Sequence, residues 1–343
     1  MKKILVIMCA ALILSGCASA ETKEYYNEAL KSMEVADYEA AEQALQQSID
    51  ADVHLAESYR ALGICYMEMG DNAKAIAAFS RSLNSLDVTD EVFKKDVMYY
   101  LAEARTNHGQ TKEAIEVYTD ILKMGKDEKS LFLRGKLELG EGDKAIAKAD
   151  FDKATEGSTD FDLYINIFNV YDAQKMSVEG EEYLNKALEI KAENSTDYYE
   201  RGRIYYYMKD YENAKKELVV ALKDGDAEAT LLLGKVYIAM EDIINARAMY
   251  QDYLESGENN TKAYNGLALC SIYEKNYESA LSNIEKGLAE GNEEEQQELL
   301  FNEIVVYEYK LDFATAKEKM TEYLKLYPED VAAIRENEFL QSR

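Results

Sequence analysis

Apolar side chains recur along most of this chain at spacings of three, four and seven residues, which is the pattern of one face of an α-helix. The stretch "YRALGICYMEMGDNAKAIAAFSRSL", residues 59–83, contains two such segments separated by Gly70 and Asp71. A glycine followed by an aspartate typically ends one helix and caps the next. A similar turn occurs at Gly142 and Asp143, and no segment alternates with the period of a strand. The pattern therefore predicts an all-α protein built from short, paired helices.

The same arrangement repeats along the chain with a period near 34 residues. The segments "YEAAEQALQQS" (38–48), "YENAKKELVVA" (211–221) and "YESALSNIEKG" (277–287) align without gaps. Their shared small residue recurs at intervals of 32 to 39 residues. Its nine occupants are Ala41, Ala75, Ala114, Ala147, Gly180, Ala214, Ala246, Ala280 and Ala316. Nine small residues in register indicate an internal repeat.

Two further positions keep this register. Twelve residues before the alanine lies a second small position, occupied by Ala29, Gly63, Ala102, Gly135, Gly202, Gly234 and Ala268, from which Phe168 and Ile304 depart. Three residues later comes an aromatic position, at Tyr66, Tyr171, Tyr205, Tyr237 and Tyr307. Small residues let two helix axes approach closely, and aromatic rings fill the space beside them. Both positions are therefore expected between paired helices, as is Tyr211, which precedes Ala214.

This register resembles the tetratricopeptide repeat, a pair of antiparallel helices with small and aromatic residues at these places. The resemblance implies an α-solenoid, a right-handed superhelix of about nine helix pairs over residues 25–327, with a concave groove lined mainly by the first helix of each pair. Residues 328–343 begin with Pro-Glu-Asp, a favourable helix start, and are expected to form a capping helix. Its apolar residues, expected to cover the end of the array, are Val331, Ile334, Phe339 and Leu340.

The N-terminus, "MKKILVIMCAALILSGC", reads as a targeting signal. Two lysines precede an apolar run that is too short to span a bilayer. The ending Leu-Ser-Gly-Cys resembles the lipobox of bacterial lipoproteins. The resemblance implies removal of residues 1–16, a lipid on Cys17, and a tether over residues 17–24. The alternative is an ordinary secretory signal followed by a chance cysteine.

The lipoprotein resemblance places the protein outside the cytoplasm, anchored to a bacterial membrane. In a cell with one membrane this is the outer leaflet. In a cell with two, Ala18 after Cys17 is not the aspartate that retains lipoproteins at the inner membrane, so the outer membrane is expected.

Charge and composition narrow the function. The net charge of −27 repels a phosphate backbone, so nucleic-acid binding is not expected and basic partners are favoured. The chain has two histidines, His54 and His108, and no nucleophile, metal or phosphate-loop motif, so we expect no enzyme activity and no metal or cofactor.

Cys65 and Cys270 fall on the same repeat position, where the other copies are apolar, so they are expected to be buried free thiols.

The family resemblance also indicates which residues face the groove. They are mixed aromatic, aliphatic and basic, and comprise Phe132, Lys136, Ile165, Asn169, Tyr199, Arg203, Tyr206, Tyr207, Lys235 and Ile238. Such a surface suits an extended peptide or a partner helix from another protein. The Lys and Asn arrangement that grips a peptide carboxyl terminus in some family members is not found. Two alternatives stay open: the groove tyrosines stack on a glycan such as peptidoglycan, or they serve packing alone.

The sequence thus predicts a lipid-anchored, extracytoplasmic scaffold that mediates protein–protein interactions in the bacterial cell envelope. A solute-binding lipoprotein is disfavoured, because that class usually needs α/β lobes.

Overall fold

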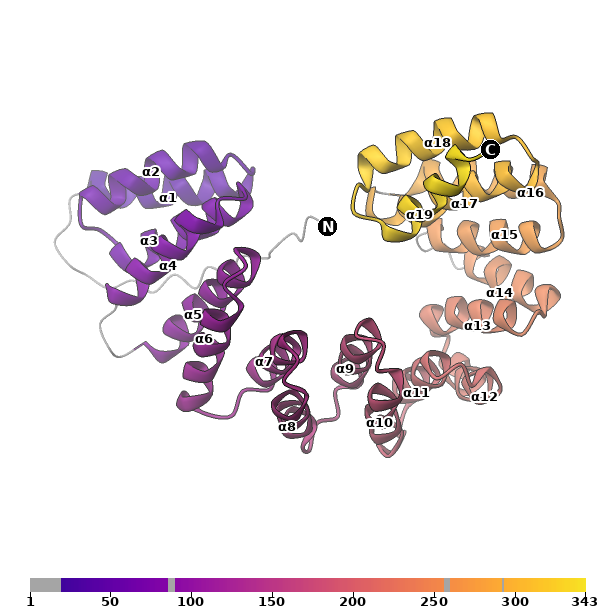
Figure 1. The fold of residues 1–343 in the computed structure, drawn as a ribbon, viewed down its shortest axis with the longest axis horizontal. Coiled ribbons are helices and arrows are strands. Elements are labelled where there is room, and N and C mark those ends of the chain that lie inside the picture. The colour runs from indigo at the N-terminus through magenta and orange to yellow at the C-terminus, as the bar shows by residue number, and fades with distance from the viewer. Residues whose placement is uncertain (1–19, 86–89, 256–259, 292) are drawn as a thin grey trace. The chain divides into compact units, whose positions relative to one another are not determined.

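A computed structural model describes residues 20–85, 90–255, 260–291 and 293–343 (Figure 1). The predicted signal peptide, residues 1–16, and Cys17 lie outside these ranges. The described part consists of helices without strands, which confirms the all-α prediction. None of these helices is long and apolar enough to cross a bilayer.

The chain divides into two compact units at Met176 and Ser177. In the N-terminal unit the helices are α1 (Ala20–Glu34), α2 (Tyr38–Asp50), α3 (Leu55–Glu68), α4 (Asn72–Asn84), α5 (Glu91–Asn107), α6 (Thr111–Met124), α7 (Glu128–Glu141), α8 (Lys144–Thr155) and α9 (Phe161–Ala173). In the C-terminal unit they are α10 (Ser177–Leu188), α11 (Ser195–Tyr207), α12 (Tyr211–Ala221), α13 (Ala227–Ala239), α14 (Ile243–Glu255), α15 (Thr261–Tyr273), α16 (Tyr277–Glu290), α17 (Glu293–Tyr309), α18 (Phe313–Leu326) and α19 (Val331–Gln341), with a short 3-10 turn at Leu222–Asp224. The boundary falls between α9 and α10, which the sequence grouped as the fifth pair.

Within each unit, consecutive helices pack as the repeat register predicts. The alanines at the repeated position are all 0% exposed, and Gly180 is buried as well. The second small position is buried against a bulky side chain of the following helix. A Cβ atom at Gly135 would lie 2.8 Å from the Phe151 ring, and one at Gly202 would lie 2.7 Å from Leu218. Close approach of the two axes therefore explains why these positions are small.

The turn inside each pair has a recurrent form. A residue with positive φ, such as Gly70 (78°) or Lys209 (59°), ends the first helix. In most pairs an aspartate follows, and its carboxylate accepts the backbone N–H three residues on, as Asp71 does from Lys74 at 3.1 Å. This left-handed residue and N-cap satisfy backbone groups that helix ends leave unpaired.

Buried residues in the C-terminal unit form successive small clusters. One joins α12 to α13, the next joins α13 and α14 to α15, and a third joins α15 and α16 to α17. Each pair therefore buries its apolar face against the next pair, as in a one-dimensional repeat array.

Cys65 and Cys270 are both buried free thiols, as predicted, and burial raises their pKa values to about 12 and about 11.

The terminal helix α19 packs on α17 and α18 through fewer residues than expected. Ala333 and Leu340 are 0% exposed and join the cluster of Ile304, Ala316 and Met320. The other apolar residues that were expected to cover the end of the array are exposed, Val331 by 59%, Ile334 by 40% and Phe339 by 40%. Ala333 and Leu340 are seven residues apart and so lie on one stripe of the 11-residue helix, and only this stripe is buried against α17 and α18.

Candidate functional site

The first helices of four consecutive pairs in the C-terminal unit line a hollow of about 590 Å³. These helices, α11, α13, α15 and α17, contact one another in sequence order, so their facing sides form one surface. The lining comprises Tyr206, Lys235, Ile238, Ala239, Thr261, Lys262, Asn265, Gly266, Leu269, Tyr273, Gln297 and Glu298, together with Tyr250 from α14.

A second hollow of about 440 Å³ continues the first toward the C-terminus. The two share Asn265, Leu269, Gln297 and Glu298, and the second extends to Tyr323 and to the start of α19. We call the two hollows together the C-terminal groove. Its walls are mainly first helices, the face that the family resemblance assigns to binding, and Tyr250 of α14, Tyr323 of α18 and the start of α19 complete them.

Hydrogen bonds between neighbouring pairs fix the polar side chains of the groove. Asn302 donates to Asn265 at 2.7 Å, and Asn265 donates to Glu298 at 2.7 Å. Farther along, Gln297 donates to the Tyr323 hydroxyl at 3.1 Å, and that hydroxyl donates to Asp330 at 2.6 Å. These bonds leave the amides with one orientation, so the groove is largely organised before any ligand binds.

Three of the ten residues that the sequence assigned to the groove line the hollow. Tyr206, Lys235 and Ile238 lie together there, from two adjacent first helices. Lys235 is exposed and forms no ion pair or hydrogen bond within the described part of the chain. Lys262 beside it is paired with Glu228 at 3.4 Å.

Three more of the predicted residues lie on α11 next to the hollow. The Arg203 guanidinium lies 5.8 Å from the centre of the Tyr199 ring and pairs with Glu200 at 2.6 Å. Burial raises the pKa of Tyr199 to about 12, against the lowering effect of Arg203. Tyr207 packs edge-on against Tyr206, with ring centres 6.3 Å apart.

The register predicts that Tyr205 packs in the core and that Tyr206 and Tyr207 face the groove, but the structure separates them less sharply. Tyr205 and Tyr211, expected in the core, are half-buried like Tyr206 and Tyr207. Tyr206 also contacts Tyr211, at 6.0 Å between ring centres. Burial, followed by the neighbouring Tyr211, raises the pKa of Tyr206, which keeps its hydroxyl protonated.

The remaining four predicted residues belong to the N-terminal unit and line neither hollow of the C-terminal groove. Lys136 and Asn169 are exposed, and Phe132 is half-buried against Phe151 at 6.2 Å between ring centres. Ile165 is only 3% exposed, so its side chain is not available to a partner. The repeat register indicates which face of a helix a residue occupies, but its exposure depends on the neighbouring helices.

Most residues of the groove were not singled out from the sequence. Asn265 and Leu269 fall on the same repeat positions as the predicted Tyr199 and Arg203, so the register could have found them. Gln297 occupies a position that the other copies fill with different residue types. Tyr250 carried a signal that was available: its repeat position holds apolar residues such as Phe79, Phe151 and Leu218 in most other copies, and a tyrosine in only one of them, at Tyr118. A hydroxyl at a packing position calls for a hydrogen-bond partner.

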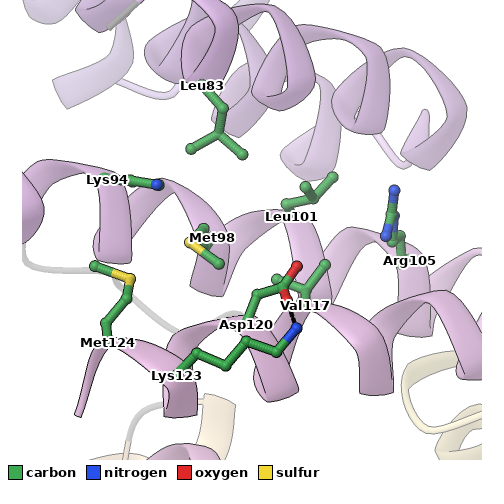
Figure 2. A pocket seen from close by; sticks show the side chains of 9 residues that line it. All are labelled: Leu83, Lys94, Met98, Leu101, Arg105, Val117, Asp120, Lys123 and Met124. Carbon is green, nitrogen blue, oxygen red and sulfur yellow. Dashed lines mark hydrogen bonds and ion pairs between the residues drawn. The ribbon is translucent and has the colours of Figure 1, made fainter. Parts of the chain in front are cut away.

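A separate hollow of about 500 Å³ lies among α4, α5 and α6 of the N-terminal unit (Figure 2). Leu83, Met98 and Leu101 form its apolar part, and Lys123 pairs across its edge with Asp120 at 2.7 Å. It lies where the interval between repeated alanines is longest, 39 residues. The longer interval is partly taken up by α5, which has 17 residues.

Within the described ranges, no group of three or more His, Cys, Asp or Glu side chains is arranged to hold a metal ion.

Comparisons with known protein families identify repeats in parts of the chain. Three family models, each described as a tetratricopeptide repeat, match residues 26–87, 96–124 and 198–223. No protein with a curated description matches the chain.

The solved structures that are similar to this chain share little sequence identity with it. A tetratricopeptide repeat protein from Parabacteroides merdae is 16% identical, with a TM-score of 0.46, over 73% of this chain and 98% of that one. Yeast Tom70 is 14% identical, with a TM-score of 0.44, over 94% and 89%. YrrB, described as a TPR protein with an unusual peptide-binding site, is 26% identical, with a TM-score of 0.36, over 55% and 97%.

Proposed function

The chain contains tetratricopeptide repeats, and from this premise we propose that it is a scaffold that binds other proteins through its C-terminal groove. The observation that carries the proposal is the continuous surface of four first helices, hollowed by about 590 Å³ and held in shape by internal hydrogen bonds. A preformed groove lowers the entropic cost of binding an extended segment.

The chemistry of the groove favours a peptide segment with an apolar or aromatic anchor. Tyr206 and Ile238 offer half-buried apolar surface, which is the kind that forms binding hot spots. Around them the protein is strongly acidic, with a net charge of −27, so basic residues flanking the anchor would speed association. An acidic partner would be repelled.

The proposal includes attachment to a membrane through Cys17. The sequence supports this, because a basic start, an apolar run and Leu-Ser-Gly-Cys occur together. Residues 20–24 of the predicted tether belong to α1 and rise only about 1.5 Å each, so the segment 17–24 reaches less than the roughly 25–30 Å of an extended chain and the repeats would work close to the membrane surface. The site of action would then be the outer face of a bacterial membrane, in assembly or recruitment of envelope proteins.

Attachment can be checked by metabolic labelling with an alkyne analogue of palmitate. The wild-type chain is expected to take up the label and to fractionate with membranes. The Cys17→Ser variant is expected to take up none, because the thioether needs the thiol. Equal labelling of both chains would contradict the lipid anchor but would leave the groove proposal unaffected.

A glycan ligand, the alternative to a protein, has weaker support in the groove. Stacking on a sugar needs open aromatic faces. The Tyr206 ring packs against both Tyr207 and Tyr211, and Tyr250 is buried, so of the rings that line the larger hollow only Tyr273 is exposed, by 54%. Sedimentation of the chain with purified peptidoglycan tests this alternative directly.

The groove itself is tested by replacing Tyr199, Arg203 and Tyr206 together with alanine. Crosslinking in cells, followed by purification and mass spectrometry, is expected to recover partner proteins at least about tenfold less than with wild type, as loss of hot-spot residues does. The matched control changes three exposed residues of α12 and α14, Glu212, Val219 and Ile244, to alanine. Unchanged recovery with the groove variant, at equal helix content, would overturn the proposal.

A further inference from the structure

Tyr250 reaches the floor of the C-terminal groove from the second helix of its pair. Its ring lies between two glycines, Gly234 on α13 and Gly266 on α15. A Cβ atom at Gly234 would lie 2.7 Å from the ring, and one at Gly266 would overlap it. The two glycines thus open a passage through which a side chain of α14 lines a hollow otherwise built from first helices.

The hydroxyl at the end of this ring lacks an internal partner. Tyr250 is 1% exposed, and its hydroxyl oxygen is buried and forms no hydrogen bond within the described part of the chain. Burial, and then the nearby Cys270, Tyr206 and Glu298, raise its pKa, so the group is a protonated donor. An unpaired buried donor destabilises the folded state, and native proteins contain few of them. Phenylalanine, which serves at the same repeat position in Phe79 and Phe151, would avoid that cost.

The amide side chains near the hydroxyl are already committed. Asn265 is bonded to both Asn302 and Glu298, and Gln297 is bonded to Tyr323. The apolar walls are Ile238 and Leu269, both half-buried. The site therefore presents a buried donor without a hydrogen bond, the Tyr250 hydroxyl, beside apolar surface. Lys235 and Glu298 also line the hollow, and their opposite charges cancel.

We infer that this hollow is the anchor subsite for an extended peptide segment of a protein partner, in which an uncharged apolar side chain packs between Ile238 and Leu269 while a backbone carbonyl accepts a hydrogen bond from the Tyr250 hydroxyl. The inference rests on the proposed protein-binding function. It adds the class of partner side chain that the groove binds and the hydrogen bond that holds the partner backbone. An extended peptide suits the site because it carries a carbonyl next to every side chain. The volume of about 590 Å³ also fits a short segment.

The experiment uses the purified full chain with labelled Ile and Leu methyl groups, observed by NMR. The probes are two acetylated and amidated heptapeptides, Gly-Ser-Gly-X-Gly-Ser-Gly, with leucine or glutamate at X. The leucine peptide is expected to shift the Ile238 and Leu269 methyl signals saturably, and the glutamate peptide to bind at least about tenfold more weakly. Absence of a saturable shift, or equal binding of both peptides, overturns the inference.

Tyr250→Phe isolates the hydroxyl. Because that hydroxyl has no partner in the free protein, the variant is expected to keep the wild-type melting temperature or exceed it. Its affinity for the leucine peptide is expected to fall by about threefold to tenfold, the worth of one hydrogen bond. Ile244→Ala, on the exposed side of α14, is the matched control and is expected to bind as wild type does. Unchanged affinity of Tyr250→Phe contradicts the assigned contact.

The crosslinking experiment in cells separates the two proposals. If the Tyr199, Arg203 and Tyr206 triple variant loses its partners while Tyr250→Phe and Leu269→Glu keep theirs, the groove binds proteins and the subsite assignment is wrong. If none of these variants loses partners, both proposals fail. Methyl shifts of Ile238 and Leu269 that depend on protein concentration without peptide would also overturn the inference, because a second copy of the chain would then fill the hollow.

Discussion

Replacing Arg134 by methionine is expected to lower the free energy of unfolding of the N-terminal unit by about 3–5 kcal/mol. Arg134, on α7, donates two hydrogen bonds to the carboxylate of Asp150 on α8, at 2.7 and 2.6 Å. A third N–H donates to the Thr119 hydroxyl on α6, at 3.0 Å. Asp150 is only 4% exposed, so the variant leaves a carboxylate buried without its charged partner. Desolvation of that unpaired charge, more than the lost attraction, accounts for the expected cost.

The measurement is chemical denaturation at neutral pH, together with hydrogen exchange of the α7 and α8 amides. The exchange data are needed because an array of repeats can open locally without unfolding as a whole. Lys123→Met is the matched control: its pair with Asp120, at 2.7 Å, has both side chains more than half exposed, and its loss should cost less than about 1 kcal/mol. The double variant Arg134→Met, Asp150→Leu is expected to recover much of the loss. Equal effects of Arg134→Met and Lys123→Met would contradict this account.

This ion pair marks a limit of prediction from the sequence. Charged residues make up 31% of the chain, and nothing in their order separates Arg134 and Asp150 from pairs that remain solvated. The small residues are different, because close helix approach excludes all larger side chains at a fixed spacing and does so in every copy. The register therefore identified Ala75 and Gly135 as buried contacts, and both are buried.

The sequence predicts which helix faces form the groove, but it does not predict the hydrogen bonds and the exposure of the residues that line it. The register placed Tyr206, Lys235 and Ile238 on neighbouring first helices, and the structure brings them to one hollow. It places Asn265 at the same repeat position as Tyr199, but it gives no sign of the bonds of Asn265 to Glu298 and Asn302 of the next pair, more than 30 residues away. Exposure and hydrogen bonding across pairs arise from side chains that meet only after stacking.

Gly266→Ala is expected to lower the free energy of unfolding of the C-terminal unit by about 2–3 kcal/mol, the cost of overpacking a rigid contact. Added at this position, a methyl group would overlap the Tyr250 ring, which Gly234 confines on its other side. The ring cannot move aside within its passage, so α15 must shift away from α14. Since α15 also carries Leu269 and Asn265, the same shift would distort the C-terminal groove.

Gly140→Ala is the control, because a Cβ atom there would have no neighbour within 4 Å. Alanine is the better helix former, so this variant is expected to be neutral or to stabilise the chain by up to about 1 kcal/mol. Removing the ring should relieve the clash, so the double variant Gly266→Ala, Tyr250→Ala is expected to be more stable than the sum of the two single losses predicts. Denaturation of the wild type, of Gly266→Ala, of Tyr250→Ala and of the double variant measures this coupling. Simple additivity would mean that the ring is not confined by Gly266, and that the position of the Tyr250 hydroxyl at the groove floor does not depend on the two glycines.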